Sequence, residues 1–199
     1  MAENPQWLIR IKTDLQELAD ASSQSTHWSK KSIYRIPASV TDLHKRAYTP
    51  QIVSIGPYHH GQPHLLPMEQ HKRRALLHFL KRAKKPIDAF VGALSPMVDD
   101  LKEAYDRLDP SWEDDGDGSK FLKMMITDGC FILEVLRKTM DPAGCAEAYA
   151  PKDPIFSDHG RLHVVPYLKR DMLMLENQIP MAVLDTLVSL QDAPHPQLK

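Results

Sequence analysis

Four histidines and one glutamate lie within thirteen residues of each other: His59, His60, His64, Glu69 and His71. Three or four such side chains can hold a zinc ion if they converge on one point, and a neutral imidazole can also transfer a proton. His60 and His64 have the spacing of neighbours on a helix face, but the Pro and Gly residues around them oppose a helix. We therefore interpret the segment as a rigid loop whose imidazoles hydrogen-bond to the backbone. We predict no metal and no cofactor.

Three carboxylates lie among apolar residues of predicted helices: Asp128, Asp171 and Glu176. The helical neighbours of Asp128 at three, four and seven residues are all apolar, namely Phe121, Met124, Met125, Phe131, Ile132 and Val135. A bare carboxylate in such surroundings costs several kcal/mol, so each of the three needs a hydrogen-bonding partner. We interpret all three as structural, together with His59 and His60.

A catalytic role for these residues is the alternative interpretation. Carboxylates can serve as general acid and base, so His59 or His60 could work with Asp128 or Glu176 in an enzyme of a class that the sequence does not identify. However, the chain has no nucleophile-elbow motif, no phosphate-binding loop and no dinucleotide fingerprint. We therefore predict that the protein is not an enzyme, and we assign no catalytic residue.

A basic amphipathic helix is predicted over residues 68–85. Its apolar stripe consists of Ala75, Leu76, Phe79, Leu80 and Ala83. Seven cationic side chains occupy much of the remaining surface: Lys72, Arg73, Arg74, Lys81, Arg82, Lys84 and Lys85. These seven residues are the candidate contacts to an anionic surface, such as a membrane.

The charge of the chain is unevenly distributed. Residues 30–85 hold twelve Lys and Arg against two acidic residues, whereas the whole chain has a net charge of −1. The simplest interpretation is that basic and acidic parts of one fold attract each other, and an anionic partner is the alternative. Phe79 is the only aromatic residue of the basic helix, which is too few for stacking with nucleic-acid bases. We predict no specific nucleic-acid partner.

The elements that position these residues are predicted to be helices. Helical periodicity covers residues 6–18, 68–85, 87–108, 119–140 and 167–190, and residues 33–55 mix short β-like runs with prolines. A chain of 199 residues with 42% apolar content can bury one sizeable core. No internal repeat and no sustained strand alternation is present. We predict a mostly α, irregular helical domain over residues 1–199, with a few short extended segments.

The last predicted helix is apolar on nearly every face, which is typical of a helix in the centre of a protein or against a second partner. Pro180 has no N–H to donate to the carbonyl of Glu176, and Asn177 lies close enough to help to organise that site. We expect one face of this helix to pack on residues 121–136 and the other to stay partly exposed.

No segment resembles a cleavable signal or a membrane span, because polar residues and Pro180 interrupt the longest apolar run. Two cysteines, Cys130 and Cys145, provide neither a disulfide framework nor a metal set. These features predict a soluble, cytoplasmic chain.

Three phrases together carry a family resemblance. They are AYTPQIVSIGPYHHGQPHLLPMEQHKRRALLHFLKR (47–82), DGCFILEVLRK (128–138) and RDMLMLENQIPMAVLDTLV (170–188), and IYRIP (33–37) precedes them. In order and spacing they resemble the domain-of-unknown-function 247 family of land plants, over about residues 30–190. The chain is similar to the N-terminal part of a member.

The resemblance implies an uncharacterised plant protein without an established enzymatic activity. Some members of the family look like recognition determinants in self-incompatibility, and others are linked to defence. Members are usually longer and end in a hydrophobic segment, so the resemblance implies a plasma-membrane location for full-length relatives. We predict a non-enzymatic module that interacts with another, unidentified protein.

Overall fold

The computed structural model describes residues 5–19, 30–113, 116, 118–141 and 148–192. In this part of the chain the regular elements are all helices, and two residues form an isolated β-bridge, Ile33 with Tyr105. The helices, in chain order, are α1 (Gln6–Ala19), α3 (Ala38–Thr41), α4 (Lys45–Tyr48), α5 (Leu66–Ala83), α6 (Ile87–Leu94), the 3₁₀ turn η1 (Ser95–Met97), α7 (Val98–Glu103), α8 (Pro110–Glu113), α9 (Ser119–Met140), α11 (Asp158–His163), α12 (Val165–Met172) and α13 (Met181–Asp192). The mostly α prediction is confirmed.

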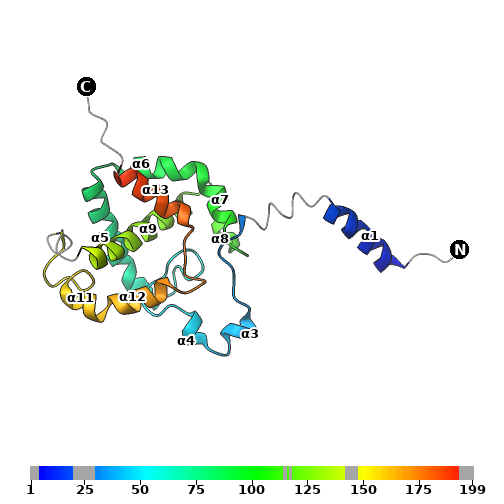
Figure 1. Cartoon of the computed structure of the whole chain (residues 1–199), viewed down its shortest axis with the longest axis horizontal. Helices are drawn as coiled ribbons and strands as arrows, with labels where there is room; N and C mark the ends of the chain where they lie inside the picture. The colour runs from blue at the N-terminus through cyan, green and yellow to red at the C-terminus, as the bar shows by residue number, and fades with distance from the viewer. Residues whose placement is uncertain (1–4, 20–29, 114–115, 117, 142–147, 193–199) are drawn as a thin grey trace, which may run out of the picture.

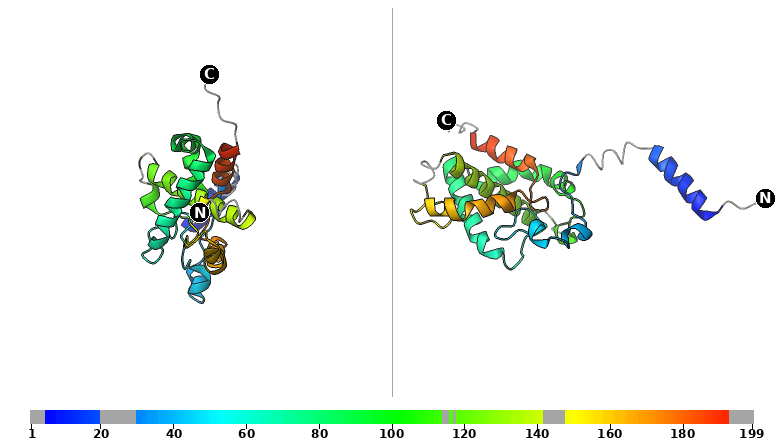
Figure 2. Two further views of the ribbon diagram at one scale, coloured as in Figure 1. Left: turned by 90° about the vertical axis from the view of Figure 1, so that its left-hand side faces the viewer. Right: turned by 60° about the horizontal axis from the view of Figure 1, so that its bottom comes forward.

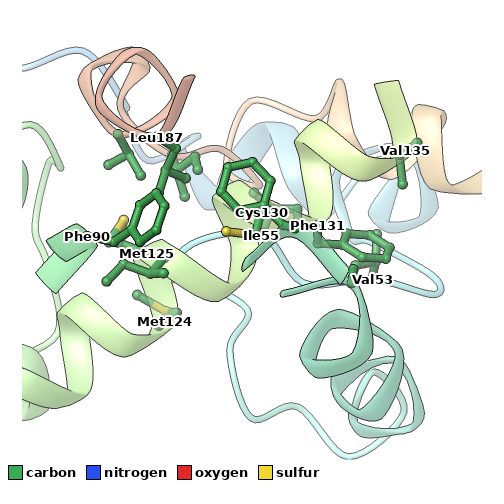
Figure 3. Packing of buried hydrophobic residues seen from close by; sticks show 14 of the residues in the cluster. Val53, Ile55, Phe90, Met124, Met125, Cys130, Phe131, Val135 and Leu187 are labelled. Carbon is green, nitrogen blue, oxygen red and sulfur yellow. The ribbon is translucent and has the colours of Figure 1, made fainter. Parts of the chain in front are cut away.

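Helix α9 is the centre of the structure. Figures 1 and 2 show α13 on one side of α9 and α11 with α12 on the other, while α5 packs along it. Twelve of its residues are buried, which is far more than the single stripe of a surface helix. In Figure 3, Phe90 of α6 and Leu187 of α13 approach α9 near Met125. The core therefore forms around one helix that contacts neighbours on several sides.

A glycine allows α13 to lie close to α9. A Cβ at Gly129 would lie 2.5 Å from Leu187 Cδ1 and 3.3 Å from Val183 Cγ1, so a side chain there would collide with buried atoms. The sequence predicted that the last apolar segment packs on residues 121–136. The contact of Val183 and Leu187 with Gly129 confirms this. Met181 and Val188 of α13 are exposed on the outer face.

The prediction of one continuous helix over residues 167–190 is wrong, because the structure has two helices there. Helix α12 ends at Met172, and residues 173–180 form a turn before α13 begins at Met181. The side-chain amide of Gln178 donates to the carbonyls of Met172 (2.6 Å) and Met174 (2.8 Å), which terminates α12. Local side-chain bonds to the backbone have replaced the helical pattern here.

Between residues 66 and 103, helices begin or are interrupted at prolines. Ser95–Met97 form a 3₁₀ turn between α6 and α7, where the sequence predicts a kink or a restarted helix. Helix α5 has Pro67 in its first turn and ends at Ala83, and the next residue, Lys84, caps it with a left-handed φ of 54°. The predicted bounds of 68–85 differ from the observed ones by two residues.

The described helices include none that is both long and apolar enough to cross a membrane. Cys130 is buried in the core, and burial raises the pKa of its thiol well above the usual range. Cys145 lies outside the described residues.

Candidate functional site

Residues 49–56 form an arm without regular secondary structure that passes into the core, where Val53 and Ile55 are buried. The carboxylate of Asp171, at the end of α12, provides the partner for its backbone N–H groups. Its Oδ2 accepts from the N–H groups of Gln51 (2.8 Å), Ile52 (2.7 Å) and Val53 (3.2 Å). Its Oδ1 accepts from Arg170 at 2.8 Å. Buried backbone N–H groups require partners, and one carboxylate supplies three of them.

Asn177 continues this pairing one step along the arm. Its Oδ1 accepts from the N–H of Ile55 at 2.6 Å, and its Nδ2 donates to the carbonyl of Val53 at 3.0 Å. A side-chain amide here has the same donor and acceptor set as a strand backbone. Nδ2 also donates to the carbonyl of Asp171 at 2.9 Å. From the sequence we expected Asn177 to help to organise the site around the carbonyl of Glu176. In the structure its side chain bonds to the arm instead.

The end of the arm is bound by a buried ion pair between α5 and α9. Gly56 N–H donates to Asp128 Oδ2 at 2.8 Å, and Lys72 Nζ donates to Asp128 Oδ1 at 2.6 Å. Lys72 also contacts Glu69 Oε1 at 2.6 Å and the Ser54 carbonyl at 2.9 Å. Lys72 and Asp128 are both fully buried. Asp128 therefore has the partner that its apolar surroundings require.

The geometry of this pair fits its ionised form. Burial alone would lower the pKa of Lys72, but the carboxylates of Asp128 and Glu69 outweigh burial and raise it. Burial raises the pKa of Asp128, and Lys72 opposes that change. Because both oxygens of Asp128 accept hydrogen bonds, a proton on this carboxyl would have no acceptor among these contacts.

Glu176 binds another non-helical segment of the chain, residues 35–36. It accepts from the N–H of Ile36 and forms an ion pair with Arg35 at 3.5 Å. The guanidinium of Arg35 lies 3.9 Å from the centroid of the Tyr58 ring. The turn after α12 thus binds residues 35–36 through Glu176, and Val53 and Ile55 through Asn177.

The histidines do not form a common site. His59 Nδ1 accepts from the side-chain amide of Gln62 at 3.0 Å, and His64 Nε2 donates to the Pro50 carbonyl at 3.1 Å. Burial lowers the pKa of both His59 and His60. Among the described residues, neither histidine has a hydrogen bond to a carboxylate, and no group of three His, Cys, Asp or Glu side chains is placed to hold a metal ion.

The seven basic residues of the predicted anionic-surface contact divide into two groups. Lys72 is buried, so its assignment to the surface is wrong, because its partners lie inside the protein. Arg74 pairs with Asp153 at 2.7 Å, Arg82 pairs with buried Glu134, and Lys85 donates to the carbonyl of Leu190.

The remaining basic residues, Arg73, Lys81 and Lys84, are exposed and take part in no ion pair within the described ranges. Their spacing, with exposed Leu77 between them, places them in one stripe along α5. The exposed basic stripe thus has three residues, whereas the sequence predicted seven.

Two buried carboxylates escaped the sequence prediction. Glu134 of α9 accepts from Tyr149 at 2.8 Å as well as from Arg82. Asp153 accepts from the N–H groups of Ile155 and Phe156, both at 2.8 Å. Cys130 and Phe131, four and three residues before Glu134, are apolar as around Asp128, but Arg137 and Lys138, three and four residues after it, are charged, so the sequence carries a weaker signal for Glu134.

These contacts define a class of protein: a helical domain in which buried polar side chains bind the backbone of an irregular arm of the same chain. The chain belongs to the DUF247 family, described as "Plant protein of unknown function", whose model matches residues 33–199. The family resemblance read from the sequence is confirmed.

Two curated proteins of Arabidopsis thaliana are similar to the chain. The "UPF0481 protein At3g47200" is 41% identical over 162 residues, and the "Putative UPF0481 protein At3g02645" is 25% identical over 194 residues. The matches cover 78% and 95% of this chain but only 30% and 32% of the relatives, so the chain spans about a third of their length. No solved structure has a significant match.

Proposed function

We propose that this plant protein is a non-enzymatic recognition module that binds another protein through the turn after α12. The observation that carries the proposal is the alternation of exposure in that turn. Leu173 is 81% exposed and Leu175 is 67% exposed, whereas Met174 and Glu176 between and after them are both 8% exposed. Two large apolar side chains therefore project into solvent from a backbone that is anchored inside the protein.

The anchoring makes the turn a rigid surface for binding. Gln178 bonds two carbonyls of the turn region, Asn177 bonds the arm, and Glu176 bonds Ile36. A loop already held in one conformation loses little entropy on binding, which favours affinity. Contiguous exposed apolar surface, unlike single scattered side chains, marks interaction sites, and Leu173 and Leu175 project from the same turn.

The proposed role in the plant extends the resemblance to the family. In a full-length protein, the module would serve self-recognition or defence signalling, presented at the plasma membrane by a hydrophobic segment. The polar residues support a non-enzymatic role, because Asp128, Asp171, Glu176 and Asn177 are all engaged with backbone groups of this chain.

The test is a double substitution, Leu173→Ser with Leu175→Ser. We expect the thermal midpoint to stay within about 2 °C, because neither side chain is buried, while binding to the protein partner is lost. Proximity labelling in plant cells identifies proteins near the native chain. Direct titration of the purified candidate against the native and variant chains then measures Kd.

The matched control is Leu77→Ser, since Leu77 is 57% exposed on α5 and lies outside the turn. This control should bind the partner with native affinity. A double variant that binds each candidate partner as tightly as the native chain would contradict the proposal.

A second candidate function is weak binding to an anionic membrane surface, favoured by the stripe of Arg73, Lys81 and Lys84. Each engaged cation contributes about 1 kcal/mol near an anionic bilayer, and salt screens the attraction. Charge reversal by Lys81→Glu with Lys84→Glu should abolish co-sedimentation with phosphatidylserine vesicles at low salt. Binding that survives both this reversal and 0.5 M salt would exclude the stripe.

A further inference from the structure

A cavity of about 810 Å³ lies between α5, α6 and the first half of α9. Its volume is within the range of about 300–1,000 Å³ that is usual for small-molecule sites. The apolar wall comes from three helices: Leu76 of α5, Ile87 and Val91 of α6, and Leu122 and Ile126 of α9. Asp171 and Glu176 do not line the cavity, and this apolar wall has room for the body of an apolar ligand.

The charged groups around the cavity favour an anion. Two carboxylates line it, Glu69 and Asp128, and the buried Lys72 contacts each of them at 2.6 Å. Three cations also line it: Arg73 from α5 and Lys120 and Lys123 from α9. Within the described residues, none of these three has an ion-pair partner, and Lys120 Nζ lies 4.3 Å from the Trp112 ring centroid. The positive charges therefore exceed the negative ones at this site.

His60 adds an unsatisfied polar atom to the same cavity. It lines the cavity, and its Nδ1 is buried without a hydrogen-bond partner in the described part of the chain. The edge contact of its ring with Trp112, at 5.4 Å between centroids, holds the imidazole in place. A buried polar atom without a partner is costly, and an oxygen of a bound ligand can satisfy it.

We propose that this cavity binds a small amphipathic organic acid. Its hydrocarbon body packs between Leu76, Val91 and Ile126, and its carboxylate is held by Arg73 and Lys123. Such a site combines an apolar wall with a few polar groups that fix the ligand's orientation. The proposal is independent of the turn at 173–175, because no residue of that turn lines the cavity.

The experiment is isothermal titration of the intact chain with decanoate and with decanamide, which has the same hydrocarbon body but no charge. We expect saturable binding of decanoate and binding at least tenfold weaker for decanamide. The variant Arg73→Ala with Lys123→Ala should reduce the affinity for decanoate at least tenfold and leave that for decanamide unchanged. Both side chains are exposed, so the fold should be retained.

Two further variants separate this site from general attraction. Lys81→Ala with Lys84→Ala removes the same charge from α5 outside the cavity and should leave decanoate binding unchanged. Val91→Trp fills the cavity and should abolish binding of both ligands. The proposal is overturned if decanoate shows no saturable binding up to millimolar concentration, if decanamide binds equally well, or if the Lys81 and Lys84 variant loses as much affinity as the Arg73 and Lys123 variant.

Discussion

Replacing Asp128 by alanine is expected to lower the free energy of unfolding by about 3–5 kcal/mol, the usual cost of leaving one member of a buried ion pair without its partner. The variant leaves the ammonium of Lys72 buried with Glu69 as its remaining carboxylate, and it removes the acceptor of the Gly56 N–H. A loss of this size is a large share of the stability of a typical domain.

Urea unfolding, followed by circular dichroism, measures this loss. The informative comparison is a double-mutant cycle with Lys72→Met, which removes the buried charge and keeps most of the volume. Each single variant leaves the other charge buried without its partner. The double variant should therefore lose less free energy of unfolding than the two single variants lose together. Additive losses, or a loss below about 1 kcal/mol for Asp128→Ala, would show that the pair does not stabilise the fold as its geometry indicates.

Gly56→Ala is expected to be nearly as damaging, for a steric reason. Gly56 has a φ of 73°, and a Cβ there would lie 2.3 Å from the carbonyl oxygen of Gln178, which also accepts from the hydroxyl of Tyr105 at 2.9 Å. The left-handed conformation costs a residue with a Cβ about 1–2 kcal/mol. Displacing a packed backbone adds about 1–3 kcal/mol.

The matched control for this change is Gly61→Ala. Gly61 has a φ of 81°, but nothing lies within 4 Å of its hypothetical Cβ. Gly61→Ala should therefore lower the free energy of unfolding only by the cost of the left-handed conformation, about 1–2 kcal/mol. Thermal melts of the two variants give the difference directly. Equal losses would mean that the turn after α12 moves away from Gly56 without cost.

Local patterns in the sequence predicted the main helices. The apolar period of residues 119–140 matches α9, and that of residues 68–85 matches α5 to within two residues. The period of residues 167–190 failed, because periodicity records where apolar side chains fall and not whether the backbone stays helical. The side-chain amide of Gln178 donates to the carbonyl of Met172, the last residue of α12, and to that of Met174 in the turn, and the apolar residues around it do not reveal these bonds.

The candidate site residues, like the helices, were predicted only in part from the sequence. The sequence by itself determined that Asp128 needs a partner, because its helical neighbours are apolar and a bare carboxylate is costly to bury. Only the tertiary structure decided that the partner is Lys72, on another helix, and that Asp171 and Asn177 bind an arm more than a hundred residues away in the chain. Seven cations near one helix look alike in sequence, yet packing placed Lys72 inside and left Arg73 exposed. Burial depends on which helix lies opposite, and local sequence does not contain that information.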